Sequence, residues 1–295
     1  MIPILNASGC LDGLTAPEVA RSLDAYVTKT VTPRPREGNA PIRIAETEAG
    51  MLNSIGLANP GIDRFLEHYL PRLAELDVPL WVSIGGFAVE DYAALASVLD
   101  GRDEVQTIEL NVSCPNVEET PESAADVVSA ARAQTPKPLY VKLSPAVADI
   151  AATAVAVQSA GADGLTLVNT IRGLALDATL RPVLGTAGGG YSGPALKPVA
   201  LAAVYACYRA TGLPIVGMGG VTTGAEALEF VAAGARSVAL GTVLFSDPAA
   251  PNRVRRELEI EAARLAVDSL DDMIGFAHRA ERAVHTLDSS LRVGA

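Results

Sequence analysis

One strand end in this chain gathers side chains suited to chemistry. An apolar run over residues 107–112 is followed at once by a thiol and an amide, Cys114 and Asn116, and it contains a second amide, Asn111. A buried cysteine is more often a small apolar filler than a catalyst. Cys114, however, lies in a polar loop, and the thiolate of an accessible cysteine can accept a proton. The pattern therefore predicts a candidate proton acceptor flanked by hydrogen-bonding amides.

Glycine-rich turns indicate a phosphate site. Gly217-Met218-Gly219-Gly220 and Leu240-Gly241-Thr242 each end an apolar run, and Ser192-Gly193 lies in the insertion before them. Glycine lets backbone N–H groups approach a phosphate, and a nearby helix N-terminus adds positive potential. One such turn would indicate only a tight connection between a strand and a helix. Two in successive loops, at a recurrent phosphate position of barrel folds, predict phosphate binding.

Two lysines fall in apolar strands. Lys29 lies near the end of the second predicted strand, and Lys142 lies in the fifth, between Val141 and Leu143. Burial of a lysine is costly unless an anion is close. An outward, solvated side chain is the alternative. A buried anionic ligand, such as a reduced flavin ring, would explain both lysines.

Four asparagines occur at strand ends or in the loops that follow them: Asn53, Asn111, Asn116 and Asn169. Asparagine is a common turn residue, so each one alone is explained by local structure. Together at one end of a sheet, they would bind a flat ligand rich in amide and carboxylate groups.

Short apolar runs alternate with longer helical patterns along the whole chain. The expected strands are residues 4–7, 25–31, 80–84, 107–112, 139–143, 164–168, 214–218 and 237–240. The expected helices are residues 16–24, 62–76, 89–99, 122–134, 147–160, 196–211, 223–233 and 248–267. Eight such units predict an α/β fold, a (β/α)8 TIM barrel, with insertions after strands 2 and 6 at residues 32–58 and 171–194. An open doubly wound sheet is the alternative. We expect residues 1–295 to form a single domain.

Composition excludes several classes of function. The 295 residues carry a formal net charge of −11 and a pI of about 4.8, without the basic stripe that a nucleic-acid-binding protein needs. The N-terminus lacks signal-peptide features, and no apolar run reaches the roughly 20 residues of a membrane span, so a cytoplasmic protein is expected. Cys10, Cys114 and Cys207 fit no zinc pattern, no metal cluster is apparent, and no histidine is assigned a role.

The motifs together resemble a known family. Asn6-Ala7-Ser8-Gly9, Thr28-Lys29-Thr30, Arg36-Glu37-Gly38-Asn39, Asn53-Ser54-Ile55-Gly56-Leu57, Asn111-Val112-Ser113-Cys114-Pro115-Asn116, Val141-Lys142-Leu143-Ser144-Pro145 and Gly217-Met218-Gly219-Gly220 look like those of class 1 dihydroorotate dehydrogenase, in family order. The resemblance runs from about residue 2 to about residue 265. It implies a barrel that binds FMN and oxidises dihydroorotate to orotate in pyrimidine biosynthesis.

The resemblance also assigns roles to residues. It implies that Cys114 removes a proton from C5 of dihydroorotate while hydride from C6 passes to FMN. The implied substrate-binding residues are Lys29, Asn53, Ile55, Gly56, Leu57, Asn111, Asn116, Asn169 and Thr170. The implied FMN-binding residues are Ala7, Ser8, Gly9, Lys29, Thr30, Asn111, Lys142, Val168, Ser192, Gly193, Gly219, Gly220, Gly241 and Thr242.

Within class 1, the chain is most similar to the class 1B catalytic subunit. That subclass implies a homodimer that pairs with an FAD and iron–sulfur subunit, as a heterotetramer, and passes electrons to NAD. Two places depart from its pattern: Ser83 stands where an FMN-contacting Asn is usual, and the loop at residues 117–122 is shorter and more acidic. Reoxidation by fumarate, as in class 1A, is therefore the alternative.

Three other functions fit part of the pattern. One is a related FMN-dependent dihydropyrimidine oxidoreductase that acts on a ring without the carboxylate. Another is a non-redox, phosphate-binding barrel isomerase or aldolase, which would leave the asparagines and Cys114 unused. The third is a flavin-binding subunit without turnover.

Overall fold

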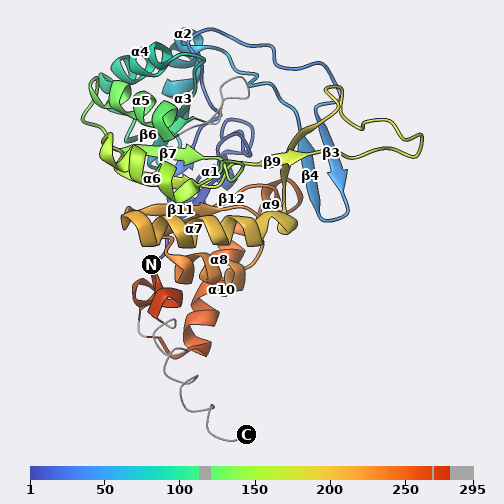
Figure 1. Cartoon of the computed structure of the whole chain (residues 1–295), viewed down its shortest axis with the longest axis vertical. Coiled ribbons are helices and arrows are strands. Elements are labelled where there is room, and N and C mark those ends of the chain that lie inside the picture. The colour runs from blue at the N-terminus through green and yellow to red at the C-terminus, as the bar shows by residue number, and fades with distance from the viewer. Residues whose placement is uncertain (113–120, 268, 280–295) are drawn as a thin grey trace, which may run out of the picture.

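A barrel of parallel strands forms the centre of the molecule. The structure, a computed structural model, describes residues 1–112, 121–267 and 269–279. Eight strands there follow the order β1-β12-β11-β8-β7-β6-β5-β2, and a bridge between Leu5 and Ala25 joins β1 to β2. The predicted (β/α)8 barrel is confirmed, and the open sheet is excluded (Figure 1). The strands are β1 (Ile4–Asn6), β2 (Tyr26–Val27), β5 (Leu80–Ile84), β6 (Thr107–Asn111), β7 (Leu139–Leu143), β8 (Gly164–Leu167), β11 (Ile215–Met218) and β12 (Ser237–Leu240).

A side chain completes the closure between β1 and β2. The Asn6 amide donates to the Val27 carbonyl at 2.7 Å and accepts from the Val27 N–H at 2.8 Å. Asn6 is fully buried, so its amide is satisfied without water. This pair of bonds adds to the main-chain bridge between Leu5 and Ala25 at the place where the two shortest barrel strands meet.

Helices cover the outside of the barrel, with α7, α8 and α10 together on one side (Figure 1). The expected helix at residues 62–76 is interrupted, because a π-helical stretch leads into α3, whose first turn contains Pro71. The expected helix at residues 16–24 is shorter, and α9 was not predicted. The helical elements are α1 (Pro17–Ala20), α2 (Ile62–Arg64), η1 (Phe65–Tyr69), α3 (Leu70–Ala74), α4 (Val89–Asp100), α5 (Pro121–Arg132), α6 (Ile150–Ser159), η2 (Pro194–Leu196), α7 (Lys197–Thr211), α8 (Gly224–Ala233), α9 (Val243–Ser246), α10 (Ala250–Arg264) and η3 (Leu270–Met273).

The strands separate two apolar cores, because successive side chains of a strand point to opposite faces. A small cluster lies inside the barrel and includes Leu5, Val27, Val216, Met218 and Ala239, with Trp81 and Tyr140 packed against it. A much larger outer cluster lies between the barrel and its helices. The inner cluster is small because polar residues occupy the rest of the barrel interior.

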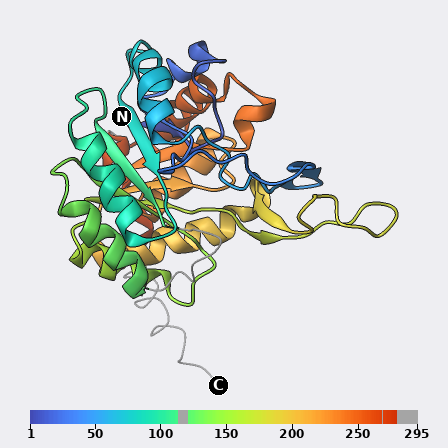
Figure 2. The same ribbon diagram turned by 90° about the horizontal axis from the view of Figure 1, so that it is seen from above.

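The two insertions form a second sheet. It consists of β3 (Ile44–Thr47), β4 (Gly50–Asn53), β9 (Ile171–Gly173) and β10 (Gly189–Ser192), in the order β3-β4-β10-β9. Its pairs are antiparallel. The connection between β9 and β10 extends away from the barrel, drawn in yellow in Figure 2. The insertions were predicted where they occur, but their pairing was not.

Candidate functional site

A chain of hydrogen bonds crosses the mouth of the barrel. The hydroxyl groups of Ser83 and Thr30 lie 3.1 Å apart, and the Asn111 amide donates to Thr30 Oγ1 at 3.2 Å. The Asn169 amide donates to Asn111 Oδ1 at 3.3 Å and accepts from the Thr170 N–H at 2.8 Å. Residues from four different strand ends therefore lie together, as the sequence predicted for Asn111 and Asn169.

Ser83 acts through its neighbours. Its side chain is completely buried, its hydroxyl faces Thr30, and its N–H donates to Thr28 Oγ1 at 3.1 Å. The serine thus supports Thr30 from inside the barrel. Thr30 in turn accepts a hydrogen bond from Asn111. The hydrogen-bond chain is therefore continuous although position 83 carries serine and not the usual asparagine.

Gly190 brings two predicted substrate residues together. The Asn53 amide donates to the Gly190 carbonyl at 3.3 Å. A Cβ at Gly190 would lie 2.9 Å from Thr170 Cβ, closer still to Thr170 Oγ1, and 3.4 Å from Asn53 Nδ2. Only glycine fits between these side chains. Sequence reasoning did not assign Gly190 to the site, although the run Gly188-Gly189-Gly190 was the available signal.

The loop after β4 is held in a fixed shape. Gly56 and Leu57 have φ values of 70° and 56°, and a positive φ is uncommon for a residue such as leucine. The Asn39 N–H donates to the Ile55 carbonyl at 3.1 Å, and its amide donates to Ser54 Oγ at 2.7 Å. Residues 55–57, which are predicted to contact substrate, therefore lie on a loop with a strained backbone, and hydrogen bonds from Asn39 stabilise that loop.

Both predicted lysines reach the same end of the barrel interior. Lys142 is buried, and its ammonium donates to Ser8 Oγ at 2.9 Å. Lys29 is half-buried, and its side chain passes over Gly9, where an added Cβ would lie 2.8 Å from Lys29 Cδ. The predicted burial of Lys142 is confirmed.

The lysines and a cysteine influence one another electrostatically. Burial, and then the charge of Lys142, lowers the pKa of Lys29 to about 8, whereas Cys10 and Glu109 act in the opposite direction. Burial raises the pKa of the Cys10 thiol more than the two lysines lower it. Cys10 therefore borders the two lysines. Cys207 is buried within α7, away from the lysines.

Three loops converge at the predicted phosphate site. Gly193, Gly219 and Gly220 have φ values of 109°, 118° and 83°, which favour glycine. A Cβ at Gly220 would lie 2.8 Å from the Gly193 carbonyl oxygen, and Thr242 Oγ1 donates to Ser192 Oγ at 2.9 Å. Within the described residues, several backbone N–H groups here donate to no protein acceptor, those of Gly193, Gly219, Gly220, Gly241 and Thr242. We call the N–H groups of these five residues the phosphate cradle.

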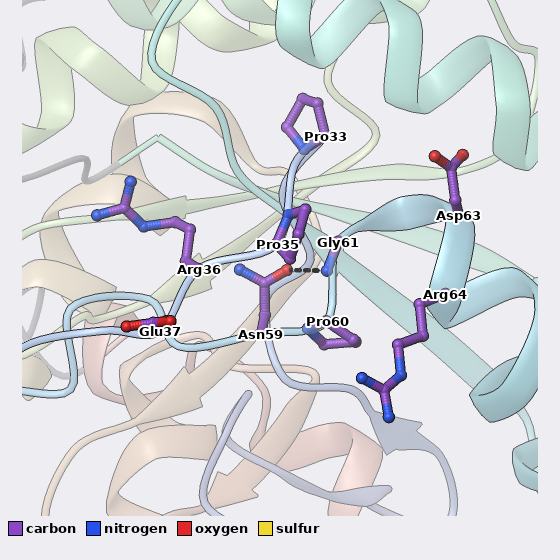
Figure 3. A pocket seen from close by; sticks show the side chains of 9 residues that line it. All are labelled: Pro33, Pro35, Arg36, Glu37, Asn59, Pro60, Gly61, Asp63 and Arg64. Carbon is purple, nitrogen blue, oxygen red and sulfur yellow. Dashed lines mark hydrogen bonds between the residues drawn. The ribbon is translucent and has the colours of Figure 1, made fainter.

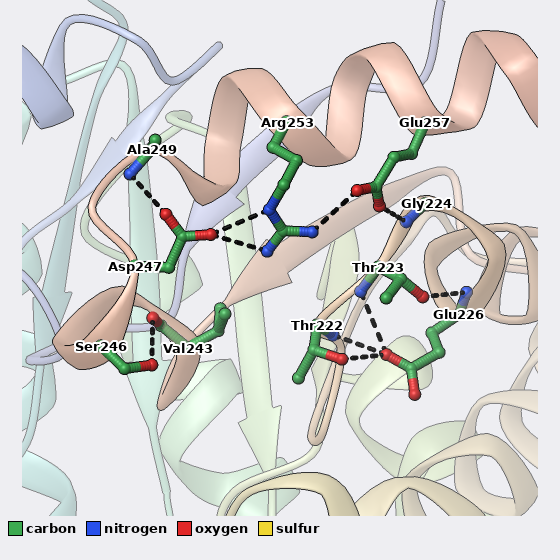
Figure 4. Close-up of polar contacts among 10 residues, drawn as sticks. All are labelled: Thr222, Thr223, Gly224, Glu226, Val243, Ser246, Asp247, Ala249, Arg253 and Glu257. Atoms are coloured by element: carbon green, nitrogen blue, oxygen red, sulfur yellow. Dashed lines mark hydrogen bonds and ion pairs between the residues drawn. The ribbon is translucent and has the colours of Figure 1, made fainter.

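The start of α8 contributes less than the sequence suggested. The Glu226 carboxylate accepts from the N–H groups of Thr222 and Thr223 at 2.8 and 3.1 Å, and Glu257 accepts from Gly224 at 2.7 Å (Figure 4). Arg253 holds Glu257 at 2.9 Å. Because carboxylates take these donors, the first N–H groups of α8 are not available to a phosphate, and the N–H groups of the loops remain.

Cys114 and Asn116 lie outside the described residues, as does most of the acidic loop at residues 117–122. Val168 is buried just beyond the end of β8, and Ala7 packs against the inner barrel core.

In the described part of the chain, no cluster of His, Cys, Asp and Glu could hold a metal ion, and no helix is both long and apolar enough to cross a membrane.

A separate hollow of about 570 Å³ lies outside this site. Arg36 and Glu37 flank one side of it and Asp63 and Arg64 the other (Figure 3). The Arg36 guanidinium lies 4.7 Å from the centre of the Phe87 ring. The hollow carries charges of both signs, and the predicted site residues do not line it.

The chain is similar to known proteins over most of its length. A family model described as "Dihydroorotate dehydrogenase" matches residues 1–261. The "Dihydroorotate dehydrogenase B (NAD(+)), catalytic subunit" of Desulforudis audaxviator is 44% identical over 94% of each chain. The protein of the same description from Shouchella clausii is 43% identical over 92% of this chain and 93% of its own.

A solved structure has the same fold. The crystal structure of DHODH from Eimeria tenella, in complex with ferulenol, superposes with a TM-score of 0.80 and covers 94% of this chain and 85% of that chain. The two sequences are 23% identical, so this likeness supports the barrel alone.

Proposed function

The chain belongs to the dihydroorotate dehydrogenase family, and from that premise we propose that it uses FMN to oxidise (S)-dihydroorotate to orotate in pyrimidine biosynthesis. The observation that carries the proposal is the meeting of amides, lysines and free backbone N–H groups at one barrel mouth. A non-redox isomerase or aldolase would need the phosphate cradle but not the amide chain.

The donor set fits FMN. The N–H groups at residues 193, 219, 220, 241 and 242, which donate to no acceptor in the described part of the chain, suit a phosphate, because backbone donors on glycine-rich loops bind anions closely. Lys142 and Lys29 would stabilise negative charge on the ring, with Ser8 and Thr30 beside them. Bound there, the flavin would supply the acceptor for the hydride that leaves C6 of dihydroorotate.

The amide chain fits the substrate. A dihydropyrimidine ring with a carboxylate offers both donors and acceptors, and amide side chains provide both. Asn53 and Thr170 meet across Gly190, while Asn111 and Asn169 bond to each other. We propose that the substrate lies between these pairs, with Asn116 and the loop at residues 55–57 completing the site.

We propose that Cys114 is the base that removes the C5 proton. Asn111, three residues before it, lies at the end of β6 at the barrel mouth, and a thiolate is the form able to accept a proton. Cys10 is a poorer candidate, because burial raises the pKa of its thiol.

The names of the relatives bear on the electron acceptor. The Desulforudis audaxviator and Shouchella clausii proteins are described as NAD(+)-type catalytic subunits. We therefore propose that this chain is a class 1B catalytic subunit, a homodimer whose electrons reach NAD through a separate FAD and iron–sulfur subunit. Fumarate, used directly, is the alternative acceptor. We also propose one FMN-binding domain over residues 1–295 and a cytoplasmic location.

Anaerobic mixing of the FMN-loaded protein with dihydroorotate tests the proposal. We expect the flavin absorbance to bleach, and to bleach much more slowly in Cys114→Ser, because an alkanol is a far weaker base than a thiolate. Cys207→Ser, a buried cysteine within α7, is the matched control. Bleaching by dihydropyrimidines without the carboxylate, but not by dihydroorotate, would select a different substrate. Equal rates for wild type and Cys114→Ser would exclude Cys114 as the base.

A further inference from the structure

A carboxyl group without a hydrogen-bond partner among the described residues is buried inside the barrel. Glu109 is completely buried, and neither of its side-chain oxygens makes a hydrogen bond to any described residue. Buried polar atoms are nearly always satisfied, and a buried charge is costly unless other charges offset it. The proposed chemistry leaves Glu109 unused, so its position needs another explanation.

The strand register shows which way Glu109 points. It is paired with Tyr140 of β7, and Asn111 is paired with Lys142. Tyr140 packs against the inner barrel core, and residues opposite each other in a ladder share a face. Glu109 therefore points into the barrel, one inward position below Asn111. It is in register with Tyr140, whose ring contacts that of Trp81, and with Ser83 of β5 on its other side.

The charges that face this carboxyl group belong to the proposed flavin site. Glu109 acts electrostatically on Lys29 in the direction that favours its ammonium form, opposite to burial and to Lys142. Lys142 itself occupies the next inward position of the adjacent strand. Because Glu109 and Lys142 are buried, such interactions are stronger than they are in water.

We propose that Glu109 is a positioning residue for the flavin. Its buried negative charge offsets one of the two positive charges of Lys29 and Lys142, so that the pair is left with the single positive charge that one negative charge on the reduced ring requires. This proposal rests on the proposed FMN function. Two ammonium groups and one carboxylate leave one net positive charge at the base of the site. Reduction of the flavin to its anionic form adds one negative charge, so the sum becomes zero.

The variant Glu109→Gln keeps the shape and removes the charge. We expect the bound flavin to favour its anionic reduced form more strongly, because two lysine charges then act without opposition. The ratio of the FMN dissociation constants for the oxidised and reduced states should increase about tenfold, which is about 30 mV in the two-electron potential. The potential is measured at pH 6.5, where Lys29, with a pKa of about 8, is protonated.

Two further variants separate charge from packing. Glu109→Asp retains the charge and should keep the potential near the wild-type value. Thr166 lies in β8, paired with Lys142, and its buried hydroxyl also lacks a hydrogen-bond partner among the described residues. Thr166→Val removes that hydroxyl and leaves the charge of the site unchanged. It should not move the potential.

A measurement without flavin tests Glu109 independently of the proposed function. Competitive acetylation of the apoprotein reports the pH at which Lys29 becomes reactive, and Glu109→Gln should lower that pH. If wild-type protein binds no FMN, the proposed function fails, whereas this measurement still decides the role of Glu109. An unchanged Lys29 titration, together with an unchanged potential in FMN-loaded protein, would overturn the inference.

A folding failure of Glu109→Gln is also informative. Charge balance predicts that Glu109→Gln combined with Lys29→Met restores folding, because the remaining Lys142 charge then equals the wild-type net charge. If the double variant also fails to fold, Glu109 serves packing alone and the inference is wrong.

Discussion

Gly190→Ala would test whether substrate lies where the two insertions meet. The added methyl group would lie 2.9 Å from Thr170 Cβ and closer to Thr170 Oγ1. The hydroxyl can rotate away, but the Cβ atom moves only with the backbone. The same methyl would lie 3.4 Å from the Asn53 amide nitrogen, at the edge of ordinary contact. The substitution therefore displaces Thr170 relative to Asn53.

The size of the effect follows from that overlap. Overpacking of this kind costs about 1–3 kcal/mol. If that cost falls on the ligand-bound geometry, affinity for orotate decreases roughly 5- to 150-fold, since 1.4 kcal/mol is a factor of ten. FMN affinity should change less, because most of the cradle N–H groups belong to the loops after β11 and β12.

Orotate binding is measured by titrating FMN-loaded protein and following the flavin absorbance. Gly101→Ala is the control for the glycine-to-alanine change, because an added Cβ there meets no atom within 4 Å among the described residues. Wild-type orotate affinity in a folded, FMN-loaded Gly190→Ala protein would refute the placement of substrate between Asn53 and Thr170.

Three other outcomes are expected. Gly220 has a φ of +83°, and an added Cβ there would lie 2.8 Å from the Gly193 carbonyl oxygen, whereas the atom nearest to an added Cβ at Gly241 lies 3.5 Å away. Gly220→Ala should therefore weaken the binding of FMN to the apoprotein at least tenfold more than Gly241→Ala does. Equal effects of the two substitutions, measured by fluorescence titration, would argue against the cradle. The pKa of Lys29 is about 8 in the folded state and near 10.4 in the unfolded state. Between these pH values the unfolded state binds one more proton than the folded state, so the free energy of unfolding rises with pH in this range. Urea titrations should show this rise in wild type and lose it in Lys29→Met; parallel pH profiles would contradict the lowered pKa. Glu226→Ala removes the carboxylate of the α8 capping box but leaves the N-cap Thr223, and it should lower the free energy of unfolding by about 1–2 kcal/mol. Glu229→Ala, at a half-exposed residue, should change the free energy of unfolding by less than about 0.5 kcal/mol.

Local sequence patterns were sufficient for the barrel. All eight strands occur where they were predicted, since buried parallel strands are continuous apolar runs bounded by turn residues. The second strand, predicted over residues 25–31, is much shorter and consists of Tyr26–Val27 alone. The expected helix at residues 62–76 was less accurate, because the periodicity of its apolar residues does not reveal a π-helical stretch.

The site was predicted in part. Lys142, Asn111 and Asn169 occupy the mouth as expected, because the carboxyl ends of parallel strands meet at one edge. The contribution of Gly190 was not predicted, since its partners Asn53 and Thr170 are distant in sequence. The assignments of Cys114 and Asn116 stay predictions.

The sequence by itself determined the strands, the glycine turns and the family, because each depends on residue type and local spacing. Only the tertiary structure decided which distant residues meet: β4 with β10 across Gly190, Ser83 with Thr30, and Glu109 with the lysines. It also decided that carboxylates take the first N–H groups of α8. These outcomes depend on long-range pairing and on which groups are buried together, and burial sets the strength of every charge interaction in the site.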